Sequence, residues 1–124
     1  MIQSIHTGNA PAAIGPYSQA KICAGMLYTS GQIAINPASS SIEEITIEGQ
    51  TIQVCENLKA VLEEAGTSFE KVVKTTCFLK NISDFTAFNE VYGRYFTSKP
   101  ARSCVGVSEL PKNALVEVEV IAEI

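Results

Sequence analysis

The sequence contains few of the residues on which several common kinds of chemistry depend. Its single histidine is His6, close to the N-terminus, so a histidine-based catalytic triad has little support. Four cysteines occur without a Cys-x-x-Cys pair, and together with the lone histidine they offer no recognisable zinc-ligand spacing (Cys23, Cys55, Cys77 and Cys104). There is no Gly-x-x-x-x-Gly-Lys phosphate loop and no Gly-x-Gly-x-x-Gly motif. We therefore expect any catalysis to use arginine, glutamate, tyrosine, hydroxyl or thiol groups, backbone amides and water.

Basic charge is also scarce. Nine lysines and arginines stand against 13 acidic residues, giving a net charge of −4, and the basic residues form no cluster. A basic stripe is the first requirement of a nucleic-acid binder, so the composition argues against that class. No apolar run reaches the roughly 18 residues that span a bilayer, and the N-terminus lacks the pattern of a signal peptide. We expect a cytoplasmic protein, with reduced thiols, that binds neither nucleic acid nor membranes.

What the chain does have is enough apolar material for a folded core. It has 124 residues, of which 46% are hydrophobic and 18% are charged. This profile is typical of one folded domain and unlike that of a disordered chain. We therefore expect a single domain over residues 1–124.

The first half of the chain predicts two strands and a helix. The strands are expected over 18–24 and 27–35, and the polar residues 36–41 are typical of a loop. A helix is predicted over about 46–65, because apolar residues recur on one face and Gly66 occupies a C-terminal cap position. The residues of that apolar face are Val54, Leu58, Val61, Leu62 and Ala65.

The second half predicts a strand, a helix and two further strands. The first strand, 70–80, is partly apolar on both faces, with Val73, Cys77 and Leu79 on one and Val72, Thr76 and Phe78 on the other. A sheet with one solvated face would alternate more cleanly, so we expect another subunit to cover the second face.

The helix is expected to begin near Ser83 or Asp84, and the final strands to cover 102–108 and 115–124. We assign its aromatic stripe to the core (Phe85, Phe88, Tyr92, Tyr95 and Phe96). The order of all these elements predicts an α+β fold, with two helices on one face of a mixed sheet.

The last two predicted strands each carry polar residues on one face. Arg102 and Cys104 share a face of the first strand, and Glu117 and Glu119 share a face of the second. If the strands pair antiparallel across the loop near 110–113, these side chains gather on one face and the valines form the other. The alternative is an ordinary arginine–glutamate pair on a solvated face, because charged residues usually lie in water.

Four sets of residues follow one another in an order that is informative as a whole. They are residues 9–19 (NAPAAIGPYSQ), 28–33 (YTSGQI), 50–51 with 57–58, and 100–105 with 110–112 and 117–119. Together they cover nearly the whole chain and resemble the Rid (RidA/YjgF) family. The resemblance implies a chorismate-mutase-like α+β fold and a homotrimer with three clefts between subunits.

The resemblance also implies an activity, that of a 2-iminobutanoate/2-iminopropanoate deaminase. Such enzymes hydrolyse 2-enamino and 2-imino acids, including 2-aminoacrylate and 2-aminocrotonate, to 2-keto acids and ammonia. These reactive compounds come from pyridoxal-phosphate dehydratases that act on serine and threonine. The implied reaction needs no cofactor and no metal, and its partner is a small-molecule substrate.

Site residues follow from the resemblance position by position. Arg102 matches the arginine that binds the substrate carboxylate, for which a guanidinium is suited because it donates two parallel hydrogen bonds. Glu117 matches the acid that positions or activates water, and Cys104 matches a cysteine whose backbone N–H holds the substrate. The residues that match the cleft lining from the neighbouring subunit are Tyr17, Ser30, Gly31 and Asn89.

Two departures and two rival functions remain open. Gly106 stands where many relatives carry a glutamate, and Lys99 replaces an aromatic residue in a short run, 96–100, so the substrate range is undecided. A non-catalytic sensor or regulatory protein that binds small carboxylates would use Arg102 but would have no need of Glu117. An RNA-cleaving translation inhibitor is disfavoured by the net charge of −4.

Overall fold

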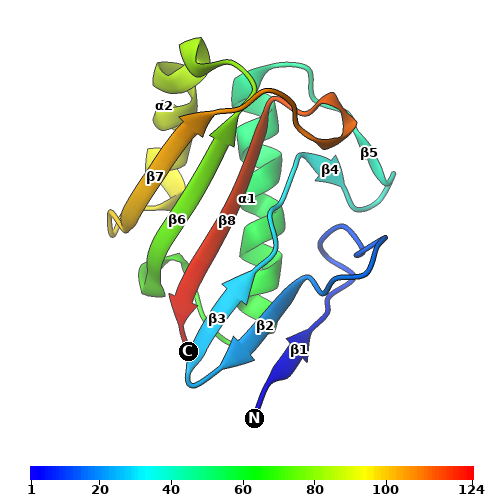
Figure 1. Ribbon diagram of the computed structural model, residues 1–124, viewed down its shortest axis with the longest axis vertical. Helices are drawn as coiled ribbons and strands as arrows, with labels where there is room; N and C mark the ends of the chain where they lie inside the picture. The colour runs from blue at the N-terminus through cyan, green and yellow to red at the C-terminus, as the bar shows by residue number, and fades with distance from the viewer.

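Two helices cover one face of a mixed sheet in the computed structural model, which describes residues 1–124 (Figure 1). Across this six-stranded sheet the order is β1 (Gln3–Ile5), β2 (Ala20–Cys23), β3 (Met26–Thr29), β8 (Val116–Glu123), β6 (Val72–Leu79) and β7 (Ala101–Gly106). Neighbouring strands are antiparallel except β6 and β7, which are parallel. Both helices lie behind the sheet in Figure 1, so its front face is uncovered. The predicted α+β architecture is confirmed.

The first helix, α1 (Ile47–Glu64), follows the prediction closely. Thr46 caps it, since its hydroxyl accepts a hydrogen bond from the backbone N–H of Gly49 at 3.0 Å. Its apolar face packs into the core, with Val54, Leu58, Val61 and Leu62 all buried. Gly66, with φ of +80°, ends the helix in a left-handed conformation that glycine adopts without strain.

The second helix, α2 (Phe85–Tyr95), buries only part of its aromatic stripe. Phe88 and Phe96 are core residues and Tyr92 is 8% exposed, as predicted. Phe85, however, is exposed, and Tyr95 is half-buried and donates a hydrogen bond to Glu56. The stripe is therefore not wholly core, because its first member lies near the edge of the sheet beside β7.

The predicted strand over 27–35 is too long. β3 ends at Thr29, and a small second sheet, β4 (Ile35–Asn36) and β5 (Ser41–Ile42), occupies part of the predicted loop. The turn between β2 and β3 is formed by Ala24 and Gly25, which have φ of 52° and 77°, one residue earlier than expected. No helix is both long and apolar enough to cross a membrane.

A β-bulge in β6 changes the predicted division of its faces. The pairing with β8 shifts between Val72 and Lys74, which leaves Val73 as an extra residue. Val72 is therefore buried on the helix side together with Cys77 and Leu79, and Val73 is 50% exposed. The predicted grouping of Val73 with the buried residues is wrong because counting in twos cannot detect an inserted residue.

The last two strands do not pair with each other, which corrects the predicted register. β6 lies between them, parallel to β7 and antiparallel to β8. A strand that follows its predecessor through a helix returns parallel to it, and here β6, α2 and β7 form such a crossover. The nine residues 107–115 then carry the chain past β6, which is long for a hairpin loop.

The corrected register places Arg102 and Glu117 on opposite faces of the sheet. Arg102 is level with Thr75 and Val120, which are buried on the helix side. Glu117 is level with Phe78 on the uncovered side. The prediction that Arg102, Cys104 and both glutamates share one face is therefore wrong within a single chain.

Candidate functional site

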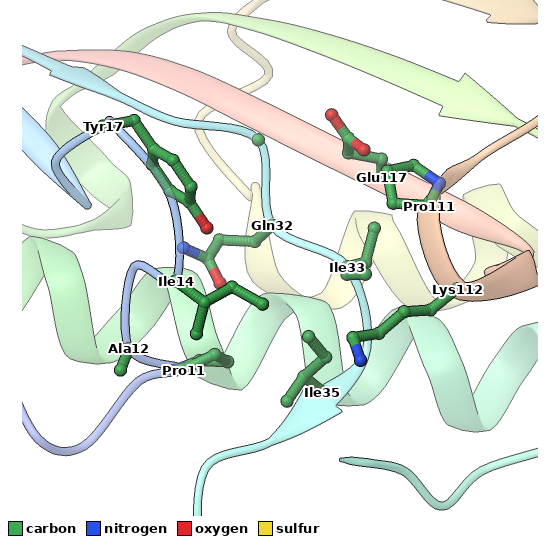
Figure 2. A pocket seen from close by; sticks show the side chains of 11 residues that line it. Pro11, Ala12, Ile14, Tyr17, Gln32, Ile33, Ile35, Pro111, Lys112 and Glu117 are labelled. Atoms are coloured by element: carbon green, nitrogen blue, oxygen red, sulfur yellow. The ribbon is translucent and has the colours of Figure 1, made fainter. Parts of the chain in front are cut away.

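One cleft has Glu117 at its edge and an apolar wall. It encloses about 270 Å³ and lies between the loop that carries Tyr17, the segment after β3, and the turn before β8. Figure 2 shows Tyr17 and Gln32 on one side, Glu117 and Pro111 on the other, and Lys112 extending toward Ile35. We call this the Glu117 cleft, with Tyr17, Gly31, Gln32, Ile33, Lys112 and Glu117 among its lining residues.

The Tyr17 loop is held in place by a buried glutamine. Gln19 is 2% exposed, and its side-chain amide donates to the carbonyls of Thr7 at 3.0 Å and Pro11 at 2.8 Å. Its side-chain oxygen accepts from the backbone N–H of Thr7 at 2.7 Å. Buried amides of this kind need all their partners, so Gln19 fixes the path of the loop that forms one wall.

The segment after β3 is fixed on both sides. The backbone N–H of Ser30 donates to the Gln19 carbonyl at 2.9 Å, and its hydroxyl donates to the Ser18 carbonyl at 2.6 Å. Gln32 and Val118 exchange two backbone hydrogen bonds, of 2.9 and 3.1 Å. The Ser30 hydroxyl is therefore occupied within the chain, and the segment is held against β8 beside Glu117.

The Glu117 carboxyl has an unusual electrostatic setting. It is half-buried, and it shares the uncovered face with Glu119, two residues along the same strand. Burial, and secondarily the charge of Glu119, raises the pKa of Glu117 above its ordinary value of 4.5. Such a group can take up or release a proton nearer to neutral pH than an exposed glutamate.

Arg102 lies in a different environment, on the helix side of β7. Its guanidinium donates a hydrogen bond to the side-chain oxygen of Asn89 at 2.7 Å. It lies 4.9 Å from the ring centroid of Tyr92 and 5.4 Å from that of Phe85, which are cation–π distances. We call Arg102, Asn89, Phe85 and Tyr92 the Arg102 cluster. All three partners are uncharged, so the cation keeps its capacity to bind an anion.

Cys104 lies next to this cluster with an unreactive thiol. It is level with Cys77 on the adjacent strand and half-buried. Burial raises the pKa of the Cys104 thiol, and Arg102 only partly opposes this. Cys77 is buried more deeply, and its pKa is raised to about 12. Because the thiolate is the nucleophile, neither sulfur is suited to covalent catalysis.

The predicted site residues thus fall into two groups. Tyr17 and Gly31 line the cleft with Glu117, and Ser30 is adjacent to it. Asn89 contacts Arg102 of its own chain, which corrects the prediction that Asn89 and Tyr17 both lie across a subunit boundary from Arg102.

Comparison with known proteins identifies the family. Residues 7–124 match the family model described as Endoribonuclease L-PSP. The chain belongs to this family. A solved structure of a Rid family protein, YyfA from Yersinia pestis, is 53% identical, with a TM-score of 0.97 and 100% of each chain covered. The resemblance to Rid proteins is therefore confirmed.

Other L-PSP relatives carry different names. A Lactococcus lactis protein named as the regulator AldR is 57% identical, over 97% of this chain and 96% of that protein. The Escherichia coli protein TdcF, solved with bound serine, is 39% identical, with a TM-score of 0.94 and 98% of each chain covered. The family is therefore established, and its members carry different functional names.

Three residues of this L-PSP chain have contacts that the sequence did not predict. Phe85 and Tyr92 are predicted as core residues, but their rings also contact the guanidinium of Arg102. Their spacing with Asn89, at i, i+4 and i+7, places all three on one helix face and could have indicated a shared partner. Lys112 belongs to a stretch that resembles the family, but nothing in its local pattern indicated that it lines the Glu117 cleft.

Proposed function

We propose that this chain hydrolyses 2-enamino and 2-imino acids to 2-keto acids and ammonia, as a 2-iminobutanoate/2-iminopropanoate deaminase. The observation that carries the proposal is the half-buried Glu117 carboxyl, with its raised pKa, at the edge of a cleft. A general acid–base group works best when its pKa lies near the working pH. The bound serine of TdcF adds support, because serine has a carboxylate beside a carbon that bears nitrogen, as an imino acid does.

The Arg102 cluster and the Glu117 cleft are proposed to meet between subunits of a homotrimer. Within one chain they lie on opposite faces of the sheet, so one substrate cannot contact both. The uncovered sheet face carries exposed apolar side chains, among them Tyr28 and Val105. Such a face favours contact with another copy of the chain. We infer that Arg102, Asn89 and Cys104 of one subunit face Tyr17, Ser30, Gly31 and Glu117 of its neighbour.

The proposed mechanism uses these residues in two roles. Protonation of an enamine at carbon first gives the imine, water then adds to the imine carbon, and the tetrahedral product expels ammonia. Arg102 binds the adjacent carboxylate through two parallel hydrogen bonds, with its guanidinium oriented by Asn89. Glu117 takes a proton from the attacking water and passes it to the imine nitrogen, and it then moves the hydroxyl proton of the tetrahedral product to the same nitrogen as ammonia leaves and the ketone forms. Free imines already hydrolyse in water, so this positioning and one proton relay suffice.

A direct assay tests the activity. Freshly generated 2-aminocrotonate is mixed with the protein, and the release of 2-ketobutyrate and ammonia is followed against buffer alone. We expect acceleration by the protein. The regulator name of the Lactococcus lactis relative favours a second candidate, a sensor of small carboxylates. Binding of 2-keto acids without any acceleration of ammonia release would establish the sensor and refute the deaminase.

Mixed assemblies test whether the cleft is shared. Subunits carrying Arg102→Lys are unfolded and refolded together with an equal amount of Glu117→Gln subunits, and light scattering checks a mass of three times 13.3 kDa. In a closed trimer formed at random, about a quarter of the clefts regain both native residues, so the mixture should recover about a quarter of the parental activity. Each variant refolded alone is the control. A mixture no more active than the average of the two controls would exclude a shared cleft.

A further inference from the structure

The backbone at Gly31 runs very close to the Glu117 side chain. A Cβ atom at position 31 would lie 2.8 Å from Cδ of Glu117 and 3.0 Å from its Cγ, and closer still to Oε2. Distances below 3.0 Å are essentially never adopted by real Cβ atoms. Gly31 is not among the residues with positive φ, so its backbone conformation is open to any residue. Glycine is therefore needed here for space and not for its conformational freedom.

The backbone at Gly31 cannot easily move away, because a bulge fixes it. Tyr28 pairs with Ile121 and Gln32 pairs with Val118, so four steps on one strand correspond to three on the other. The Thr29 hydroxyl fills the gap in the ladder by accepting from the Val120 N–H at 3.0 Å. With hydrogen bonds on both sides of Gly31, the flexible Glu117 carboxyl would yield before the backbone does.

We propose that Gly31 is a positioning residue, whose missing side chain lets the Glu117 carboxyl rest against the backbone at the edge of the cleft. The proposal rests on the role proposed above for Glu117. Any side chain at position 31 would displace the carboxyl from the backbone and toward solvent. It would leave the fold intact, because only the end of one side chain has to move.

Close packing against Gly31 also accounts for part of the dehydration of Glu117. The charged or titratable groups that face Glu117 are Glu119 on its own strand and Lys112 and Tyr17 in the cleft. Level with Glu117 on this face are the uncharged residues Phe78 on β6, the adjacent strand, and Val105 on β7 beyond it. A carboxyl displaced toward water would lose its burial while these neighbours stay in place, so its pKa would fall toward 4.5.

Gly31→Ala tests the proposal, with Gly8→Ala as the matched control because a Cβ at Gly8 meets nothing within 4 Å. We expect Gly31→Ala to lower kcat by roughly 10²-fold, the effect of misplacing a catalytic group by about 1 Å. In the substrate-free protein, the pKa of Glu117 measured by NMR titration should fall toward 4.5. Gly8→Ala should change neither. Parental kcat together with an unchanged Glu117 titration in Gly31→Ala would overturn the proposal.

A double-mutant cycle with Glu117→Ala separates positioning from direct substrate contact by the Gly31 backbone. Alanine lacks the Cγ, Cδ and Oε2 atoms that a Cβ at position 31 would meet, so nothing is left there to be displaced. We expect Glu117→Ala to reduce kcat by itself and the further Gly31→Ala change to reduce it no more. Independent, multiplying losses would overturn the positioning role. If the parental protein proves inactive on 2-aminocrotonate while Gly31→Ala still lowers the Glu117 pKa, the positioning holds and the deaminase proposal alone fails.

Discussion

The Arg102 cluster and the Glu117 cleft have opposite effects on the charge of the side chain that each contains. Arg102 lies against two aromatic rings and an amide, none of which can take or give up a proton near neutral pH. Glu117 lies beneath a glycine backbone and beside a second carboxyl, and its pKa is raised by burial and by Glu119. The first environment keeps a charge constant, and the second makes a charge easy to change.

This difference matches the division of work in the proposed reaction. Binding a carboxylate needs a cation whose charge and orientation do not vary during turnover. Moving protons needs a group that exists in both states at the working pH. Because the two environments lie on opposite faces of one sheet, each can be altered without rebuilding the other.

Glu117→Gln is the strongest way to test the contrast. The amide keeps the size of the side chain but cannot exchange a proton at neutral pH, so kcat should fall by roughly 10² to 10⁴. Binding of a product-like 2-keto acid should persist or tighten slightly, because a negative charge has been removed from the cleft. Steady-state kinetics and calorimetry measure the two effects. Turnover at the parental rate would show that another residue transfers the proton, and Glu119 would be the next residue to test.

Arg102→Lys should have a smaller effect of a different kind. An ammonium cannot form the two-pronged contact, and losing one charge-assisted hydrogen bond of about 1.5–3 kcal/mol lowers kcat/KM roughly ten- to hundredfold. The matched control is Arg94→Lys, at an exposed position in the last turn of α2. An Arg102→Lys variant with parental kcat/KM would show that the Arg102 cluster does not bind the substrate carboxylate.

Glu119→Gln should produce the smallest change, confined to pH dependence. Removing the neighbouring charge lowers the pKa of Glu117, but only partway to 4.5, because burial is the larger cause of the shift. The limb of the pH–rate profile that belongs to Glu117 should move to lower pH, with little change at its plateau. A limb that stays in place would mean that Glu119 does not act on Glu117.

The same shift has a signature in stability. A carboxyl whose pKa is raised in the folded state binds protons more tightly there than in the unfolded chain. Its contribution to stability is therefore greatest below the ordinary value of 4.5 and decreases as pH rises through the higher folded value. Relative to the parental protein, Glu119→Gln should gain stability as pH rises through that window, as measured by urea denaturation.

How much the sequence could predict depended on the range of the interactions involved. The first helix and its Gly66 end were predictable because the apolar repeat lies within the helix and the glycine lies directly after its last turn. The family resemblance was equally accessible, because it rests on residue identities in order. Neither the helix signals nor the order of residue identities depends on which strands pair in the folded chain.

The pairing of the last strands was not accessible in the same way. Alternation correctly grouped Arg102 with Cys104 and Glu117 with Glu119, but nothing local indicates that β6 lies between the two strands. The bulge at Val73 reversed a predicted face for a related reason, since only the partner strand reveals an extra residue. The sequence was therefore sufficient to identify these side chains. Only the strand order shows that they lie in two separate environments.

The position of β8 has a consequence for how the protein is made. This strand lies between β3 and β6, and both of these neighbours precede it in the chain. During synthesis they leave the ribosome with one edge each unpaired, and the sheet cannot close until β8 follows. Contacts that join residues so far apart in sequence form slowly. A nascent chain therefore has neither a continuous sheet nor a positioned Glu117 until β8 is inserted between the unpaired edges of β3 and β6.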